Sequence, residues 1–315
     1  MVQRNAILEE LSAFRRQLQR HKVPYPSLFR LNPWIPVRDI CMDWTTILLA
    51  VTAVCFTSWW LTPVALVLIA NRQRALGNIL HDAGHRNLHR APWLNDGIAN
   101  LLVAPLMFTS MQKYRESHFL HHVNLGDSDG DPDYLVPATF EQKGGWAKSY
   151  LHQALNLRAW WASTVGDLGD TGTPLMSRLY MLGWWVVIGS LMCMAAGHAF
   201  AALFTALWFI SRATLFHLIT TFREMCDHYG LESGGVVSFS RDIAHHGLWS
   251  RFFHPRNNGY HLTHHLLPAV PYYSLPRAHR LIRTMPMYRL FDHLFISYWL
   301  GARPVVDQWN AKERM

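Results

Sequence analysis

The sequence predicts an all-α integral membrane protein, with four transmembrane helices in two hairpins and a cytosolic helical cap. Half of the 315 residues are hydrophobic and only 16% are charged, whereas a typical soluble domain has about 25% charged residues. Two long stretches, residues 44–71 and 179–211, contain no Asp, Glu, Lys or Arg. The chain also has 14 tryptophans and 11 tyrosines, which is typical of proteins anchored at two membrane–water interfaces.

The lengths of the two charge-free stretches decide how often each crosses the bilayer. One span needs about 20 apolar residues, so each stretch is long for one helix and just long enough for a hairpin. Pro63 and the small-residue segment MAAGHA (194–199) are the predicted turns. We therefore expect spans at about 44–61, 63–80, 179–196 and 199–218. A cytosolic N-terminal segment (1–42), a membrane domain (43–300) and a C-terminal tail (301–315) complete the predicted organisation.

The hairpin interpretation places both termini and the segment 72–178 on one side of the membrane. All 29 Lys and Arg residues then lie on that side, as the positive-inside rule expects of the cytoplasm. If each stretch crossed once, histidine-rich segments near residues 120 and 263 would face opposite sides. Residues 97–111 are apolar but short, so we expect an interfacial or buried helix there.

Composition also excludes some classes of protein. The net charge of +8 comes from basic residues beside apolar spans, so we expect no nucleic-acid partner. The four cysteines form no CxxC pair, which argues against a disulfide framework and a thiolate zinc site. Residues 1–40 contain no apolar leader, so no cleavable signal peptide is expected.

Three histidine clusters carry the chemistry: HDAGH (81–85), HFLHH (118–122) and HLTHH (261–265). Residues at i, i+3 and i+4 share one helix face, so each cluster can aim imidazoles at one point. Adjacent histidines diverge by about 100° on a helix, so each HH pair can serve two metals. The clusters therefore favour a dinuclear centre. Imidazole binds Zn, Cu, Fe and Ni alike, which leaves the metal open.

Further polar residues are candidates for supporting roles. His228, in REMCDHYG, follows the predicted fourth span and is a further candidate ligand, and His89 could extend the face of the first cluster. The acidic run GDSDGDPDYL (126–135) alternates carboxylates like a calcium loop, but position 12 is Ala138 and not the Glu of an EF-hand. We expect carboxylates to orient the ligand histidines through their N–H groups. The candidates are Asp127, Asp129, Asp131, Asp82, Glu224 and Asp227. We expect His245, His246 and His254 to support the ligands from behind or to lie at the surface. We do not expect His198 to bind the metal.

The three clusters resemble the histidine boxes of the membrane fatty-acid desaturase and hydroxylase superfamily. HDAGH, HFLHH and NNGYHLTHHLLPAVPYYSLPRAH occur in the order of those boxes, and the resemblance runs from about residue 45 to 285. EMCDHYGL (224–231) is also similar to a segment of membrane alkane hydroxylases, with Asp227 in place of a glutamate. The resemblance implies a non-haem di-iron site in the cap. The implied ligands are His81, His85, His118, His121, His122, His228, His261, His264 and His265.

The resemblance further implies an O2-dependent oxidoreductase that attacks an unactivated CH2 group. The implied substrate is a fatty acyl chain linked to lipid, CoA or a carrier protein, and no catalytic residue is expected beyond the ligands. Electrons would come from an external ferredoxin or similar donor and its reductase. The expected location is a bacterial inner membrane, as a multi-pass protein with a cytoplasmic active site.

Other functions remain open at this point. The ligand set does not separate removal of a second hydrogen from oxygen insertion, so a hydroxylase, carotenoid ketolase or alkane monooxygenase is an alternative. A desaturase of an amino-acid-derived or other secondary metabolite is another. A histidine-rich metal transporter would place ionisable ligands inside the spans. Apart from His198, the charge-free stretches contain none.

Overall fold

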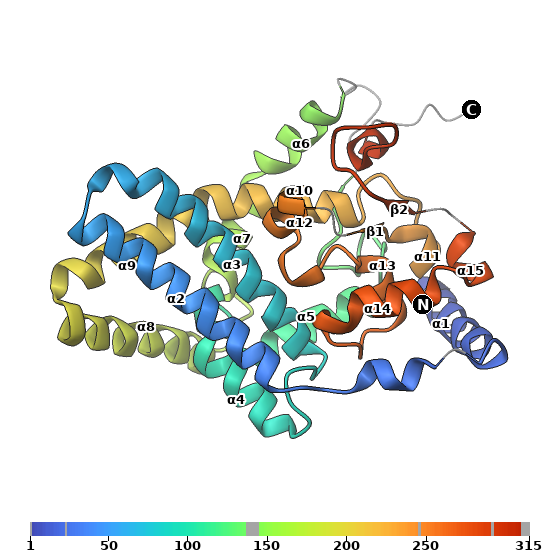
Figure 1. Cartoon of the computed structure of the whole chain (residues 1–315), viewed down its shortest axis with the longest axis horizontal. Coiled ribbons are helices and arrows are strands. Elements are labelled where there is room, and N and C mark those ends of the chain that lie inside the picture. Colours follow the sequence, from blue (N-terminus) through green and yellow to red (C-terminus); the bar gives the residue numbers. More distant parts are fainter. Residues whose placement is uncertain (1, 23, 137–144, 245–246, 291–292, 310–315) are drawn as a thin grey trace. The chain divides into compact units, whose positions relative to one another are not determined.

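The computed structural model describes the chain except for residues 1, 23, 137–144, 245–246, 291–292 and 310–315 (Figure 1). Ala138, His245, His246 and the end of the predicted tail lie outside the described residues. The regular secondary structure of the described part is helical apart from one short parallel pair, β1 (Asp242–Ile243) with β2 (Leu294–Phe295). The helical fold class is therefore confirmed.

The chain divides into two compact units. Unit 1 comprises Met1–Leu31, Arg115–Gln153 and Thr221–Met315, and unit 2 comprises Asn32–Tyr114 and Ala154–Thr220. Two helices, α5 (Met111–Val123) and α10 (His217–Asp227), run through the division. The predicted domain boundaries after residues 42 and 300 remain predictions.

Unit 2 is built on two helical hairpins. Its long helices are α2 (Trp34–Phe56), α3 (Thr62–Gly84), α8 (Leu175–Ala196) and α9 (His198–Ser211). Figure 1 shows α2 running beside α3 and α8 beside α9, and α9 also packs against α2 and α3. Both turns fall where the sequence predicts them. Pro63 lies in the first turn of α3, and Gly197 joins α8 to α9 with a φ of 88°, a conformation that glycine adopts without strain.

Three of the described helices are long and apolar enough to cross a membrane: Trp34–Phe56, Leu175–Ala196 and the continuous helix His198–Asp227. The first of these helices begins ten residues before the expected span. Its additional residues include Asp39 and Asp43, and both are buried. Helix α3 is not among the three, because its second half carries the polar run NRQR (71–74). The fourth span therefore remains a prediction.

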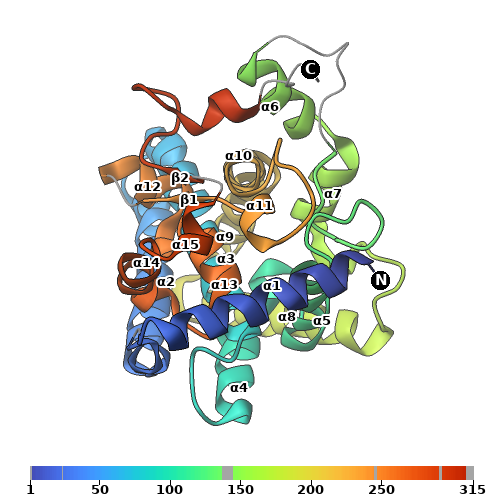
Figure 2. The same cartoon turned by 90° about the vertical axis from the view of Figure 1, so that its right-hand side faces the viewer.

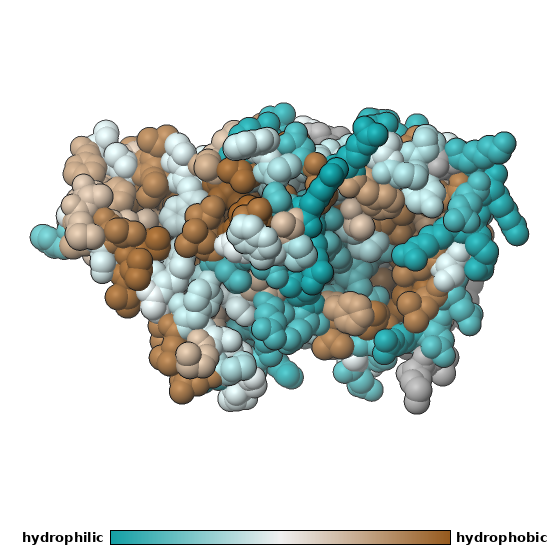
Figure 3. Space-filling view, turned by 90° about the horizontal axis from the view of Figure 1, so that it is seen from below, coloured by the Kyte–Doolittle hydropathy of each residue, from teal (hydrophilic) through white to brown (hydrophobic). Residues whose placement is uncertain are grey.

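The apolar helices also present hydrophobic side chains outward. On α8, Leu182, Val186 and Leu191 are each more than half exposed. Figure 3 shows hydrophobic side chains gathered over one end of the face drawn. A water-soluble monomer rarely exposes such a surface. It fits contact with lipid chains.

Two tryptophans of unit 2, the buried Trp184 and the partly buried Trp44, bind the end of a short helix. The short helix α4 (Pro92–Leu102) overlaps the first part of the segment 97–111, which is predicted to be interfacial or buried, and a 3-10 turn (Ala104–Met107) follows it. Helix α4 is not among the three membrane candidates. The last carbonyls of a helix have no partner within it. Trp44 and Trp184 donate their indole N–H groups to Leu102 O and Leu101 O, at 3.0 and 2.8 Å. Two carbonyls at the end of α4 thereby gain partners from outside the helix.

A buried arginine links the remaining parts of unit 2. A π-helical turn (Arg212–Phe216) follows α9, and α7 (Leu157–Val165) packs against it. The Arg212 guanidinium donates to Thr164 O at 2.8 Å and to Met107 O at 3.0 Å. These backbone carbonyls reduce the cost of burying the charge.

Unit 1 consists of shorter helices around the β1–β2 pair (Figure 2). Besides parts of α5 and α10 it contains α1 (Val2–Arg20), α6 (Trp146–Ala154), α11 (Val236–Phe239), α12 (Gly247–Phe253), α13 (His261–Leu266), α14 (Leu275–Ile282) and α15 (Pro286–Arg289). Phe222, Met225 and Ile243 belong to its apolar core. Helix α13 packs against both α11 and β1, and this arrangement positions the third histidine cluster.

Candidate metal centre

Seven of the nine predicted ligands lie in unit 1, and their ring nitrogens gather in two groups. The first group is His121, His228, His261 and His265, all buried, with ligand atoms within 4.8 Å of one another. The second is His118, His122 and His264, whose ligand atoms also lie within 4.8 Å of one another.

The adjacent histidines of each HH pair fall into different groups. On α5, His121 belongs to the first group and His122 to the second. On α13, His265 belongs to the first group and His264 to the second. Successive residues on a helix point about 100° apart, so two short helices can each contribute to two groups.

The other two predicted ligands lie in unit 2. His81 is in the last turn of α3, and His85 is the residue that ends this helix. Their ring centroids are 5.4 Å apart, with the planes at 71°. They therefore form a pair on one helix face, as the i, i+4 spacing predicts.

The spacing of the nitrogens fits a shared metal ion. His261 Nε2 lies 2.8 Å from His228 Nε2 and 3.0 Å from His265 Nε2. In the second group, His122 Nε2 lies 3.0 Å from His118 Nε2 and 3.2 Å from His264 Nε2. Two nitrogens at right angles on one metal, each about 2.1 Å from it, are roughly 3 Å apart. The donor set is all imidazole, which suits iron, zinc, copper or nickel.

Two rings are held from behind in the tautomer that a metal needs. His121 Nδ1 donates to Asp131 Oδ1 at 2.8 Å, and His228 Nδ1 donates to Phe239 O at 2.7 Å. With the proton on Nδ1, the lone pair is on Nε2. An acceptor behind the ring fixes its orientation and makes it a stronger ligand.

Burial keeps most of the first group neutral. It lowers the pKa of His228 to about 4, with a contribution from nearby His121. Burial and the neighbouring histidines also hold the pKa values of His261 and His265 well below the usual range. Burial alone would lower the pKa of His121, but the hydrogen bond to Asp131 and the charge of Asp133 more than offset it and raise that pKa. Neutral rings have free lone pairs for a metal at pH 7.

Asp227 connects the first group to another buried histidine, His254, which is outside both groups. Its carboxylate lies 3.7 Å from His261 Nδ1 and accepts from His254 Nε2 at 3.2 Å. His254 Nδ1 in turn accepts from the Tyr298 hydroxyl at 2.8 Å. Arg223, one turn earlier on α10, pairs with Asp227 at 2.8 Å, so this buried carboxylate is compensated.

Arg241 and Asp242 fasten the histidine-bearing elements together. The fully buried Arg241 guanidinium donates to Tyr229 O at 2.8 Å and more weakly, at 3.4 Å, to two carbonyls in the last turn of α10. A cation suits a helix C-terminus because the carbonyls there carry negative partial charge. His228 directly follows this turn, so Arg241 helps to fix its position.

Asp242 does the same for α13. Its Oδ1 accepts from the Thr263 backbone N–H at 2.9 Å, and its Oδ2 accepts from the Thr263 hydroxyl at 2.5 Å. His279 Nδ1 and the Tyr288 hydroxyl also donate to Oδ2, at 2.9 and 2.6 Å. Burial and the Asp242 charge raise the pKa of Tyr288, so its hydroxyl stays protonated as a donor. The roles of Arg241 and Asp242 are not predicted from the sequence, because neither residue lies in a repeated spacing.

Some of the other candidates for supporting roles lie behind ligand histidines, and others do not. Asp131 and Asp227 lie behind ligand histidines as described, and His254 lies behind Asp227. Asp127 Oδ1 instead accepts from the Asp129 N–H at 3.1 Å, a local turn contact. Asp129 is exposed. None of these carboxylates belongs to the two groups.

The remaining candidates make local contacts or lie apart. Asp82 accepts weakly from Asn87 Nδ2 at 3.4 Å, and Glu224 lies 3.8 Å from the Arg223 guanidinium. His89 Nδ1 accepts from the Ala91 N–H at 2.9 Å, and His198 is exposed at the start of α9.

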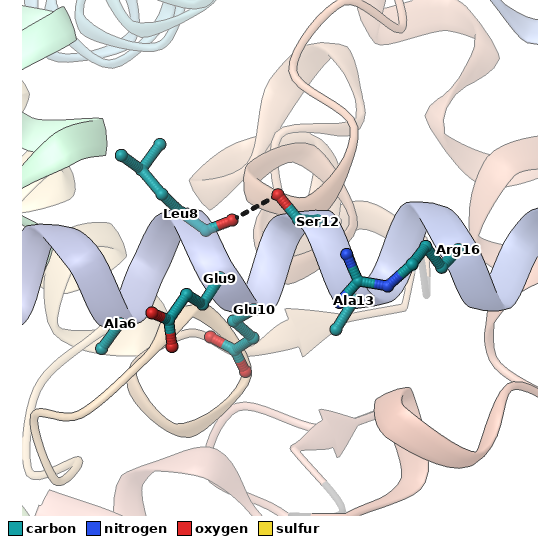
Figure 4. Close-up of a pocket in the computed structure, with 7 residues that line it drawn as sticks. All are labelled: Ala6, Leu8, Glu9, Glu10, Ser12, Ala13 and Arg16. Atoms are coloured by element: carbon teal, nitrogen blue, oxygen red, sulfur yellow. Dashed lines mark hydrogen bonds between the residues drawn. The ribbon is translucent and has the colours of Figure 1, made fainter.

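A surface hollow lies along α1, apart from any histidine (Figure 4). It is lined by Ala6, Leu8, Glu9, Glu10, Ser12, Ala13 and Arg16. The lining comes from one helix and offers no ring nitrogen. The hollow is therefore not part of the metal centre.

Comparison with known proteins agrees with the histidine chemistry. The model of the family described as fatty acid desaturase matches residues 57–295. Dihydrorhizobitoxine desaturase of Bradyrhizobium elkanii is 26% identical, over 87% of this chain and 84% of its own. The sn-1 oleoyl-lipid 12-desaturase of Anabaena variabilis is 23% identical, over 84% and 83%. A Nostoc sn-1 acyl-lipid omega-3 desaturase (ferredoxin) is 24% identical, over 72% and 69%.

Proposed function

Because the chain belongs to the fatty acid desaturase family, we propose that it is a membrane di-iron desaturase that introduces a double bond into a fatty acyl chain. That it is a desaturase-like oxidoreductase follows from the family and its relatives. The acyl substrate, linked to lipid, CoA or carrier protein, the iron count and the side of the membrane are parts of the proposal.

The observation that carries the proposal is the division of each HH pair between two groups of ring nitrogens. Two groups on the same helices match the need for two metal ions close together. We propose the nine histidines His81, His85, His118, His121, His122, His228, His261, His264 and His265 as the ligands. Bound iron would supply the power to oxidise an unactivated C–H bond with O2.

The protein's own residues hold and orient the ligands and keep water out. Asp131 and the Phe239 carbonyl fix two rings, while Arg241 and Asp242 fasten the elements that carry them. The overall reaction removes two hydrogens from adjacent carbons. It consumes O2, two electrons and two protons, and gives an alkene and two waters.

The electrons come from a separate donor in this proposal, a ferredoxin or a similar protein with its reductase. The name of the Nostoc relative, which includes ferredoxin, supports it. If each charge-free stretch forms a hairpin, the 29 Lys and Arg residues belong to segments on one side of the membrane. This asymmetry supports four spans and a cytoplasmic site in a bacterial inner membrane.

The decisive experiment uses the full-length protein in lipid, loaded with ferrous iron and supplied with reduced ferredoxin and O2. Mass spectrometry of acyl lipids should show loss of two hydrogens. Gain of one oxygen atom would instead identify a hydroxylase or related oxygenase. The variant His121→Ala should lose iron and activity, whereas His198→Ala, an exposed histidine outside both groups, should keep both. Zinc without iron in the native protein, or full activity of His121→Ala, would contradict the proposal.

A second candidate substrate class has support of its own. The dihydrorhizobitoxine desaturase, which aligns over 302 residues, is named for a compound other than an acyl lipid. Desaturation of a small secondary metabolite is therefore the alternative. Offering both substrate classes to the same reconstituted protein distinguishes them.

A further inference from the structure

A continuous series of contacts within unit 1 leads from the first group of histidines to the protein surface. Its inner part joins one close charge contact, between His261 and Asp227, to two hydrogen bonds made by His254. Asp227 lies between His261 Nδ1, at 3.7 Å, and His254 Nε2, at 3.2 Å, and His254 is bonded to the Tyr298 hydroxyl at 2.8 Å. All four side chains are buried.

The outer part is aromatic. The Tyr298 ring stacks on His254, with centroids 5.6 Å apart and planes at 8°. Next along the series, the Trp299 centroid lies 5.8 Å from that of Tyr298 and 4.9 Å from that of Trp249. Phe253 touches the same rings, at 5.4 Å from Tyr298 and 6.1 Å from Trp249. Near the surface, two routes of ring contacts therefore join Tyr298 to Trp249, one through Trp299 and one through Phe253.

The series ends on an exposed patch that is both apolar and basic. Trp249 is 51% exposed, and its neighbour Leu248 is 78% exposed. Arg251 on the same helix is exposed. On the adjoining loop Leu300 is 71% exposed and Arg303 is exposed. A large exposed aromatic ring with surrounding charge of one sign is typical of a site for a partner of opposite charge.

We propose that this patch, Leu248, Trp249, Arg251, Leu300 and Arg303, docks a small acidic one-electron carrier, and that the series from Trp249 to His261 is the route by which its electrons enter. The inference rests on the proposed function, because it needs iron at the histidines. In each docking event the reduced carrier loses one electron and one ferric ion becomes ferrous, so two events reduce both ions. An electron crosses a series of ring and hydrogen-bond contacts faster than the same distance through empty space.

The test measures iron reduction without turnover. Full-length protein in lipid nanodiscs is loaded with ferric iron and mixed anaerobically with reduced ferredoxin, and oxidation of the ferredoxin is followed by stopped-flow absorbance. Trp249→Ala should keep its iron and its reduction by dithionite, but reduction by ferredoxin should slow by about tenfold or more. Trp249→Phe should be close to wild type because it keeps a ring. Trp93→Ala, a tryptophan that is 73% exposed on α4, is the matched control and should be unchanged.

Charge provides an independent arm. Arg251→Glu should slow ferredoxin reduction by about tenfold at low ionic strength, and the difference should shrink at high salt because screening removes long-range attraction. Arg16→Glu, an exposed arginine on α1, is the control for a general change in net charge. Tyr298→Phe should leave the salt dependence intact but slow the electron step that follows docking.

The outcomes separate the two proposals. Wild-type rates with ferredoxin for Trp249→Ala and Arg251→Glu would overturn the docking surface while leaving the desaturase proposal in place. Quenching of Trp249 fluorescence by brominated lipid in the nanodisc would also overturn it, since the patch would then face the membrane. Absence of iron from the wild-type protein, or iron that neither reductant can reach, would overturn the proposed function itself.

Discussion

The ring of His121 is fixed from behind by a carboxylate that is itself fixed. Asp131 accepts from His121 Nδ1 and also from the backbone N–H groups of Gly126 and Asp133, each at 2.9 Å. Burial would raise the pKa of Asp131, but these donors more than offset it and lower that pKa. The carboxylate is therefore charged at neutral pH and holds the imidazole in one tautomer.

Replacing Asp131 should weaken metal binding without unfolding the protein. Asp131→Asn keeps the size of the side chain but loses the charge that makes His121 a strong donor to metal. We expect iron affinity to fall by about 10- to 100-fold, measured by competition with a chelator. Asp129→Asn, an exposed neighbour, should change nothing. Equal affinities for the two variants would show that Asp131 does not act on the metal.

The lowered histidine pKa values make the metal-free protein sensitive to acid. Unfolded histidine has a pKa of about 6.5, whereas that of His228 is about 4 and those of His261 and His265 are well below the usual range. Between these values the unfolded chain binds more protons. The stabilisation is therefore complete above about pH 6.5 and is lost as the pH falls toward 4. The raised pKa of His121 opposes this trend, but it is one group against three.

We expect the melting temperature of the iron-free protein in detergent to fall as pH is lowered from 7 to 5. His265→Asn should show a smaller fall, because one of the three groups is gone. A melting temperature that rises on acidification would contradict this assignment.

At the level of elements, Arg241 and Asp242 connect three pieces of chain that are distant in sequence. Arg241 donates to carbonyls at the end of α10, and Asp242 receives donors from α13, α14 and α15. Burial lowers the pKa of Arg241 to about 10, so it remains charged at pH 7. Consecutive residues of opposite charge thereby hold His228 and the third histidine cluster in register.

Asp242→Asn should destabilise unit 1 more than it alters any ligand directly. The amide cannot accept from all four donors, so at least one buried polar group loses its partner. Removing one member of such a buried charged network costs about 3 kcal/mol. Thermal unfolding in detergent measures the loss, and Asp307→Asn, an exposed acid in the same unit, is the control. An unchanged melting temperature for Asp242→Asn would mean that α13 is held by its apolar contacts alone.

At the level of the whole molecule, the proposed topology has four spans, although only three of the described helices are long and apolar enough to cross a membrane. The fourth, α3, carries Arg72, which pairs with Asp43 on α2 at 2.9 Å. An ion pair between the two helices of one hairpin reduces the cost of burying either charge.

Cysteine labelling tests this topology. With the four native cysteines replaced by alanine, Thr57→Cys and His198→Cys should react with a membrane-impermeant maleimide from the periplasmic side. Arg16→Cys should react only after the cells are opened. Labelling of Thr57→Cys and His198→Cys from opposite sides would contradict the two-hairpin arrangement.

The sequence predicts the features of this protein that are local in the chain. Charge-free stretches and Pro63 predict the helices of unit 2 and their turns, and histidine spacing predicts which rings share a helix face. Asp131 lies next to its cluster and was also found. Arg241, Asp242 and Tyr298 were not predicted, because their roles depend on partners brought close only by folding. The early start of α2 was missed for a similar reason, since Asp43 and Arg72 compensate each other across the hairpin.

The sharing of α5 and α13 between two groups has a consequence for how the protein fills with metal. An ion bound by His121 and His265 fixes the rotation of both helices. The directions of His122 and His264 are then fixed as well, so the second ion enters a site that is already ordered. Loading should therefore be cooperative: native mass spectrometry at half-saturating iron should show mainly chains with no ion and chains with two. A random distribution dominated by singly loaded chains would mean that the two sites fill independently.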